Sequence, residues 1–196
     1  MSKLRSVLMV IVGLLAVAMS ILMFVGDAEY IFTGKTVNLN EVLTNGEELP
    51  SGKFVTYECY YPMGSYGEIQ SYYSFIPLPG KTHEFAMMTE SNIIISAEIG
   101  KKSKIDEFNS KTEDFLSDKE IEPIVLTGQL KTNGDDLDQL LEDYFSDIDL
   151  ASNGLILTSY SIDTTQTRAG NAALYSFFLL ASVLLIVIYV RKLMTK

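Results

Sequence analysis

The chain has 196 residues, one cysteine, no tryptophan and a formal net charge of −10. All 25 acidic residues lie between residues 26 and 171, together with ten of the 15 basic residues. A segment with this excess of negative charge repels nucleic acid and anionic lipid headgroups, so the composition argues against either as a partner. A single cysteine excludes an intrachain disulfide.

Two uninterrupted apolar runs lie near the ends of the chain, at residues 7–25 and 172–190. Each is 19 residues long and contains neither a charged residue nor a proline. As a helix, each run would extend about 28 Å, which is close to the thickness of the hydrocarbon core of a bilayer. Because a segment inside lipid must satisfy its backbone polar groups within a helix, the runs predict two transmembrane helices in contact with the lipid bilayer.

Basic residues close to the apolar runs predict the orientation of the chain. Lys3 and Arg5 precede the first run, and three basic residues follow the second: Arg191, Lys192 and Lys196. On the other side, only Lys35 and Arg168 lie within about 15 residues of a run. We therefore expect a two-pass protein of the cell membrane, with residues 1–6 and 191–196 in the cytoplasm and residues 26–171 as one extracytoplasmic domain.

A cleaved signal peptide is the alternative interpretation of residues 7–25. Ala16, Val17 and Ala18 resemble a cleavage site of small residues after a basic N-terminal region. However, the apolar run continues to Val25, and its length matches a full membrane span rather than the apolar part of a signal peptide. We therefore favour a retained membrane anchor.

Strand and helix patterns alternate between the two runs. Helical patterns cover residues 38–43, 103–117 and 135–145, and strand patterns cover residues 54–61, 69–76, 84–89, 92–99, 124–130 and 155–162. This order predicts an α+β domain that has a mainly antiparallel sheet with two or three short helices on one face, flanked by the two transmembrane helices. In the last short helix, five apolar residues are expected to face the sheet: Leu137, Leu140, Leu141, Tyr144 and Phe145.

A tyrosine-rich segment between residues 57 and 75 is the candidate contact surface. We expect the strands at 54–61 and 69–76 to pair as a hairpin whose turn contains Gly64 and Gly67. Such a turn would expose an adaptable thioether and aromatic rings, which are enriched at protein interfaces. Ordinary packing of strand tyrosines is the alternative. The predicted partner-contact residues are Met63, Tyr66, Tyr72 and Tyr73.

The residues with catalytic or metal-binding potential form no recognisable pattern. His83 is the only histidine, so a histidine-based triad or a zinc site would lack its other members. Asp147 and Asp149 resemble calcium ligands, but Ala151 occupies a ligand position, and Gly154 comes too late for an EF-hand. We therefore predict no catalytic residue, no metal site and no cofactor.

An extracytoplasmic domain without such a pattern favours an interaction function. We expect a membrane-anchored, non-enzymatic interaction or scaffold domain of the cell envelope, with a membrane or envelope protein as its partner. The alternative is a membrane-tethered hydrolase that acts on an envelope polymer or peptide, using two of the many carboxylates. A pocket with converging polar groups and a carboxyl of perturbed pKa would favour the enzyme, and a shallow surface the interaction domain.

Three segments carry a resemblance to a family. They are Phe75-Ile76-Pro77-Leu78-Pro79-Gly80-Lys81, Pro123-Ile124-Val125-Leu126-Thr127-Gly128-Gln129-Leu130 and Ser159-Tyr160-Ser161-Ile162-Asp163. In this order, and between two apolar runs, they resemble small two-span membrane proteins of unknown function from Gram-positive, often gut-dwelling, bacteria. The resemblance implies no activity and carries over no catalytic residue. An exported domain without disulfides or N-x-Ser/Thr sequons also fits a bacterial plasma membrane.

The predicted orientation can be tested with a cysteine introduced at an exposed site between residues 26 and 171. We expect a membrane-impermeant thiol reagent to label this cysteine on intact cells, because the basic residues place the domain outside the cytoplasm. A cysteine added after Lys196 serves as the control and should be labelled only after permeabilisation. The opposite pattern of labelling would reverse the orientation.

Overall fold

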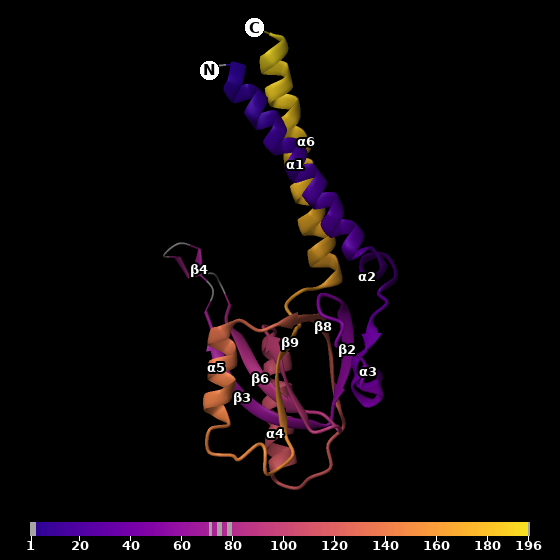
Figure 1. The fold of residues 1–196 in the computed structure, drawn as a ribbon, viewed down its shortest axis with the longest axis vertical. Coiled ribbons are helices and arrows are strands. Elements are labelled where there is room, and N and C mark those ends of the chain that lie inside the picture. Colours follow the sequence, from indigo (N-terminus) through magenta and orange to yellow (C-terminus); the bar gives the residue numbers. More distant parts are fainter. Residues whose placement is uncertain (1–2, 71, 74–75, 78–79, 196) are drawn as a thin grey trace. The chain divides into compact units, whose positions relative to one another are not determined.

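A computed structural model of the chain describes residues 3–70, 72–73, 76–77 and 80–195. The chain forms two compact units. The first, which we call the helical unit, combines Met1–Lys35 with Thr167–Lys196, and the second, which we call the sheet domain, spans Thr36–Gln166. Figure 1 labels their elements.

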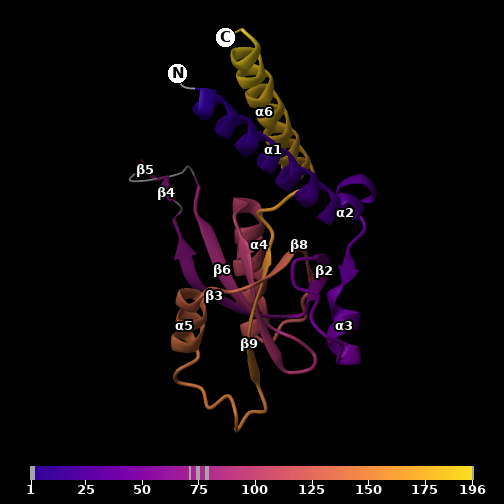
Figure 2. The ribbon, with the colours of Figure 1, turned by 45° about the horizontal axis from the view of Figure 1, so that its top comes forward.

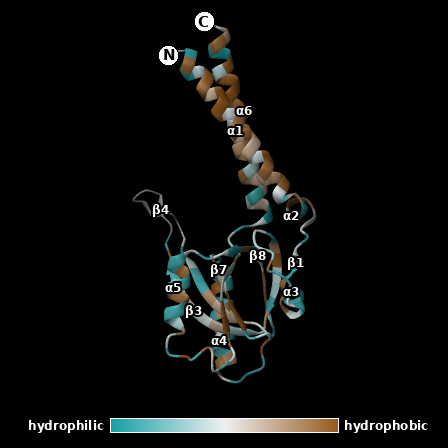
Figure 3. Cartoon of the chain, viewed as in Figure 1, coloured by the Kyte–Doolittle hydropathy of each residue, from teal (hydrophilic) through white to brown (hydrophobic). Residues whose placement is uncertain are grey.

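The helical unit consists of two long helices and a short one. Helix α1 spans Lys3–Gly26, α2 spans Ala28–Thr33 and α6 spans Arg168–Met194. Both α1 and α6 are long and apolar enough to cross a membrane, and Figure 3 shows apolar residues along most of their length. Two long apolar helices at the ends of the chain are thus confirmed.

Small residues allow α1 and α6 to approach each other closely. A Cβ atom added to Gly13 would lie 2.6 Å from Ile186 Cγ1, so a larger residue at this position would require the Ile186 side chain or the helices to shift. Ser20 of α1 and Ser182 of α6 are buried, and each hydroxyl donates to the carbonyl four residues earlier. Small side chains at the contact are typical of helix pairs in membranes.

Polar contacts join the residues that follow α1 to the beginning of α6. Asp27 accepts hydrogen bonds from the Tyr175 hydroxyl, at 2.5 Å, and from the Asn171 side chain, at 3.3 Å. Arg168 donates to the two carbonyls of residues 31 and 32, at the end of α2. A cationic side chain stabilises the free carbonyls of a helix C-terminus, so Arg168 fixes α2 to α6.

The sheet domain contains a seven-stranded sheet and, in the described part of the chain, three helices. The helices are α3 (Leu39–Asn45), α4 (Lys102–Leu116) and α5 (Asp135–Tyr144). The strands are β1 (Val37–Asn38), β2 (Phe54–Cys59), β3 (Tyr61–Ile69), β4 (Tyr72–Tyr73), β5 (Ile76–Pro77), β6 (Thr82–Met88), β7 (Ile93–Ile99), β8 (Ile124–Thr132) and β9 (Ile156–Asp163). The order in the sheet is β1-β2-β8-β9-β7-β6-β3, and β4 and β5 form a separate pair.

The seven-stranded sheet is mixed. Four of its pairings are antiparallel, namely β2–β8, β8–β9, β7–β6 and β6–β3. The other two, β1–β2 and β7–β9, are parallel. The expected α+β class is therefore confirmed, while the two parallel pairings arise from long connections whose course local sequence patterns do not reveal.

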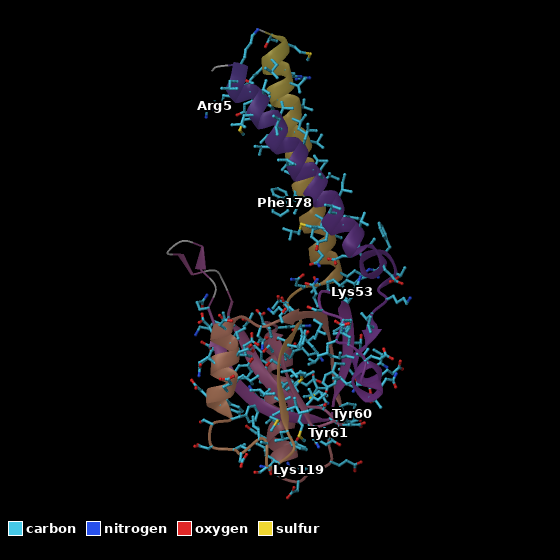
Figure 4. All side chains as sticks on the ribbon, in the orientation of Figure 1. Arg5, Lys53, Tyr60, Tyr61, Lys119 and Phe178 are labelled. Atoms are coloured by element: carbon cyan, nitrogen blue, oxygen red, sulfur yellow. The ribbon has the colours of Figure 1, made fainter. Side chains whose placement is uncertain are left out.

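The sheet curls because two strands at distant positions in its order are neighbours in the sequence. Only Tyr60 separates the end of β2 from the beginning of β3, although β2 is second and β3 is last in the sheet order. Since consecutive Cα atoms lie only 3.8 Å apart, these two strand ends must meet. Figure 4 shows Tyr60 and Tyr61 together at one end of the sheet domain.

The two faces of the curled sheet carry separate hydrophobic cores. On the inner face, Phe85 of β6 packs against Phe108 of α4, with ring centroids 4.4 Å apart. On the outer face, Ala86 of β6 packs with Leu141 and Phe145 of α5. Figure 2 accordingly shows α4 among the strands and α5 at the outside. The expectation that the helices share one face is therefore wrong, because adjacent residues of β6 point to opposite faces.

The expected hairpin between residues 54 and 76 is also wrong. Strand β3 continues through Gly64 and Gly67 at the edge of the sheet and pairs with β6. Its register against β6 shifts twice, which leaves Met63 and Tyr66 as the extra residues of two bulges. Proline and glycine occur in bulges and edge strands as well as in turns, so Pro62 and the two glycines were compatible with either structure.

The apolar residues of α5 face the sheet only in part. Leu141 and Phe145 are buried, and Leu137 is half-buried. In contrast, Leu140 is 43% exposed and Tyr144 is 42% exposed, which corrects the expectation that all five pack on the sheet. Helix α5 lies over the edge strand β3, so the sheet covers only one side of its apolar stripe.

We expect Leu141→Ala to lower the free energy of unfolding by about 2–5 kcal/mol, because it removes a fully buried side chain from the outer core. The control is Gln139→Ala on the exposed side of the same helix, which should change it by less than about 0.5 kcal/mol. Denaturant unfolding of both variants measures the difference. Equal stabilities would show that α5 is not packed on the sheet as described.

Candidate functional site

The four predicted partner-contact residues lie in two strands. Met63 and Tyr66 lie in β3 and are half-buried. Tyr72 and Tyr73 form β4, which pairs with β5, and their side chains lie outside the described part of the structure. The exposed turn that was expected to present Met63 and Tyr66 is replaced by a bulged strand. Contact of these four residues with a partner stays a prediction.

The two bulges of β3 are hydrogen-bonded to α5 and to β7. The Tyr66 hydroxyl donates to Ser96 of β7 at 2.9 Å, so this side chain points into the domain. The Tyr144 hydroxyl of α5 donates to the Met63 carbonyl at 2.8 Å. Gly64 leaves room for this contact, because a Cβ atom there would lie 2.9 Å from the Tyr144 hydroxyl oxygen. The glycine therefore serves a close approach rather than a turn.

An apolar strip remains exposed beside these contacts. It consists of Leu140, Tyr144 and Ile148, of which Ile148 is 44% exposed, and we call it the α5 strip. The residues recur every four positions along α5 and the turn that follows it, so they lie on one side. Exposed carboxylates border the strip: Asp136, Asp143 and Asp147.

A row of ionisable side chains crosses the outer face of the sheet. Glu84 of β6 lies opposite Glu98 of β7, and Glu98 lies opposite Asp163 of β9. Lys131 of β8 forms a close ion pair with Glu98 and lies 3.4 Å from Asp163 Oδ2. We call these four residues the ionisable row. Among the described residues, no three His, Cys, Asp or Glu side chains converge in a way that could hold a metal ion.

Glu84 is the fully buried member of the ionisable row. It lies opposite Gly67 of β3, and a Cβ atom added to Gly67 would lie 3.7 Å from Glu84 Cβ and 3.8 Å from Leu140 Cδ1. Strand β3 and helix α5 therefore enclose it. Among the described residues, neither carboxyl oxygen of Glu84 has a hydrogen-bond partner, and the buried hydroxyls of Thr82 and Ser161 also lack one.

Burial disfavours the ionised form of Glu84 and raises its pKa to about 7. The charge of Glu98 raises the pKa further, the charge of Lys131 opposes this effect, and Asp163 adds to it. The Tyr66 hydroxyl lowers the pKa of Glu84. This effect is the smallest of those named, because the hydroxyl donates its proton to Ser96 and not to Glu84. The carboxyl of Glu84 therefore changes its charge near neutral pH, where an exposed carboxyl is already ionised.

The sequence patterns did not identify the ionisable row. Glu84 alternates with Phe85 and Met87 in a strand, an arrangement that normally places the charged residue in solvent. Its burial depends on α5, which comes much later in the chain. The available signal was weak: Glu98 and Asp163, like Glu84, lie at or near the ends of strands.

Comparisons of the chain with protein-family models, curated proteins and solved structures give no match. The resemblance to two-span proteins of Gram-positive bacteria stays a prediction. The function must therefore be inferred from the residues of the α5 strip and the ionisable row.

We expect the stability of the sheet domain to fall as the pH rises from about 4.5 to about 7. In this range the unfolded chain has released the proton of Glu84, whereas the folded domain retains it, so unfolding releases a proton. The difference between the pKa of Glu84 in the folded and the unfolded chain corresponds to roughly 3 kcal/mol in the free energy of unfolding. This stabilisation is present at a pH below the pKa of the unfolded chain, and it is lost once the pH exceeds the pKa of the folded domain.

Denaturant unfolding at about pH 5 and pH 8 tests this dependence. Glu84→Gln keeps the shape of the side chain without an ionisable group, so it should be more stable than the wild type at pH 8 and should lose most of the pH dependence. Glu90→Gln, which changes an exposed glutamate, is the control and should behave as the wild type does. Equal pH dependence in both variants would contradict the assignment to Glu84.

Proposed function

We propose that the chain is a two-pass protein of a bacterial cell membrane, with both termini in the cytoplasm and the sheet domain outside. Two helices of sufficient length and apolarity, α1 and α6, support the membrane location. Arg191 and Lys192 in the last turn of α6, and Lys3 and Arg5 in the first turn of α1, support the cytoplasmic termini.

We infer that the sheet domain is a non-enzymatic interaction domain and that the α5 strip is its main contact surface. The observation that carries this inference is the exposure of Leu140, Tyr144 and Ile148 on one side of α5 and the turn that follows it. Tyr144 is held in place by its hydrogen bond to Met63, so a partner would not need to order it on binding. Rigid aromatic and apolar side chains of this kind are common at the centre of interfaces.

The neighbouring edge of β3 is poorly suited to pairing with a strand of another protein. Its two bulges interrupt the regular spacing of backbone donors and acceptors, and Pro62 lacks a backbone N–H group. Contact at this side of the domain would therefore use side chains rather than an added strand. Met63 of β3 is half-buried against the outer core that α5 covers. Its side chain would extend the apolar surface of the α5 strip.

The partner is proposed to be a membrane or envelope protein. A domain tethered through two helices meets other proteins of the same membrane at high effective concentration. The acidic border of the α5 strip favours a partner whose apolar contact is flanked by basic residues, because complementary charges increase the rate and specificity of association. The acidic domain makes nucleic acid an unsuitable partner.

A membrane-tethered hydrolase acting on an envelope polymer or peptide is the alternative. The raised pKa of Glu84 favours it, because a carboxyl that titrates near pH 7 can act as a general acid. Glu84 is enclosed by β3 and α5, however, so a substrate would reach it only if α5 moved. The interaction domain requires no such movement and is therefore preferred.

Crosslinking and affinity capture from native membranes test the proposed contact surface. We expect the double variant Leu140→Ser and Ile148→Ser to reduce the amount of captured partner about tenfold or more, because loss of central apolar contacts commonly costs at least about 1–2 kcal/mol. The matched control is Val125→Ser and Ile156→Ser, which changes two exposed apolar residues on β8 and β9 and should leave capture unchanged.

Quantitative mass spectrometry of the captured proteins identifies the partner and measures its amount. Undiminished capture by the α5-strip variant would reject this surface. Tyr66→Ala is not a useful probe of the contact, because the loss of its hydrogen bond to the buried Ser96 would also destabilise the domain.

A further inference from the structure

The ionisable row lies where the chain leaves the sheet toward α6. Asp163 is the last residue of β9, and residues 164–166 form the connector that precedes the helical unit. Thr164 donates to the Glu98 carbonyl from its backbone nitrogen, at 3.0 Å, and from its hydroxyl, at 2.8 Å. The Asp163 carboxylate accepts from the backbone nitrogen and the hydroxyl of Thr165, at 2.9 and 2.6 Å. Asp163 therefore holds the connector through its carboxylate, and Glu98 holds it through its backbone carbonyl.

Protonation of Glu84 decides the charge balance of this row. With Glu84 neutral, Lys131 neutralises one of the two carboxylates that it contacts, those of Glu98 and Asp163. With Glu84 ionised, three carboxylates at adjacent strand positions share one ammonium group on a largely shielded face, and the negative charges disfavour one another.

Among the described groups that chiefly act on the charge of Glu84, only Lys131 is positively charged. Tyr66 of β3 faces the carboxyl, and burial raises the pKa of this tyrosine, so it stays neutral. Asp138 of α5 contributes negative charge to the same region, because it acts electrostatically on Tyr66. Among the described residues, no positive charge beyond that of Lys131 therefore replaces the proton on Glu84.

The end of β9 is the part of the row that can respond to this repulsion. Glu84 is fully buried and enclosed, whereas the Lys131 side chain is 33% exposed and lies at the margin of the row. Gly128 of β8 lies close to the end of β9, since a Cβ atom added to it would be 2.3 Å from the Asp163 carbonyl oxygen. Among the carboxylates of the row, that of Asp163 contacts the connector directly through its side chain, so a displacement of Asp163 would carry the connector with it.

We propose that Glu84 is a proton-binding site that controls how firmly the connector of residues 164–166 is held on the sheet. Protonated Glu84 keeps Asp163 and Glu98 in place, and the connector stays bound through Thr164 and Thr165. Ionised Glu84 repels Asp163 and releases the connector. Under the proposed orientation, the domain would thereby transmit the pH outside the cytoplasm to the segment that enters α6.

Hydrogen–deuterium exchange of the full-length protein in lipid nanodiscs tests this proposal. The Thr164 amide, which donates to Glu98, is followed at pH 6 and pH 8 and corrected for intrinsic exchange rates. In the wild type we expect its protection to fall about tenfold between the two pH values, because each unit of pH above the pKa changes the equilibrium about tenfold. In Glu84→Gln, protection should stay high at both pH values, and the control Glu90→Gln should follow the wild type.

Two exchange results would overturn the proposal: protection in the wild type that does not change with pH, or a pH dependence that persists in Glu84→Gln. A carboxyl carbon NMR titration of the wild type gives an independent measurement that requires no variant. A midpoint near the raised pKa of about 7 supports the proposal, and a midpoint near the ordinary value of about 4.3 overturns it.

A metal cation is the other ligand that could balance an ionised Glu84, whose carboxyl oxygens are buried without described partners. The exchange measurement at pH 8 is therefore repeated with Na⁺, K⁺, Mg²⁺ or Ca²⁺ at constant ionic strength. Restored protection in the wild type, but not in Glu84→Gln, would show that a metal ion is the ligand and would overturn the assignment to a proton. No effect of these cations supports it. None of these measurements depends on a protein partner, so failure here is distinct from failure of the proposed interaction function.

Discussion

The short connection through Tyr60 is the constraint on which the sheet domain depends. It joins two strands from distant positions in the sheet order, and the sheet must curl to allow it. The curl brings side chains of β2, β6 and β8 into one inner core, which α4 and α3 complete. Helix α5 is left to pack on the outer face, over the edge strand β3. That position both buries Glu84 and leaves one side of α5 exposed.

Local signals in the sequence predicted the elements that local chemistry determines. Asn38 caps α3 by accepting from the Asn40 backbone nitrogen, and its side-chain amide donates to Glu41, as the spacing of these residues predicts. The apolar runs likewise predicted α1 and α6, because a long uninterrupted run needs no tertiary information. These features depend on residues within a few positions or within one continuous run.

Features that depend on distant segments could not be predicted in the same way. The residues around Pro62 and Gly64 suit a turn as well as a bulge, and pairing with β6 decides between them. Glu84 looks like a solvated strand residue until α5 covers it, and its alignment with Glu98 and Asp163 depends on strand register. The candidate site was therefore missed for a physical reason: each of its members is ordinary within its own strand.

Leu140 connects the two proposed activities of the sheet domain. It belongs to the exposed α5 strip, and its Cδ1 atom also lies over Gly67 beside Glu84. A partner that presses Leu140 onto the sheet would strengthen the exclusion of water from Glu84, and this favours the protonated form. By thermodynamic linkage, protonation of Glu84 must then strengthen partner binding by the same free energy. Release of the connector and release of the partner would thus be favoured by the same rise in pH, because both follow from the ionisation of one buried carboxyl.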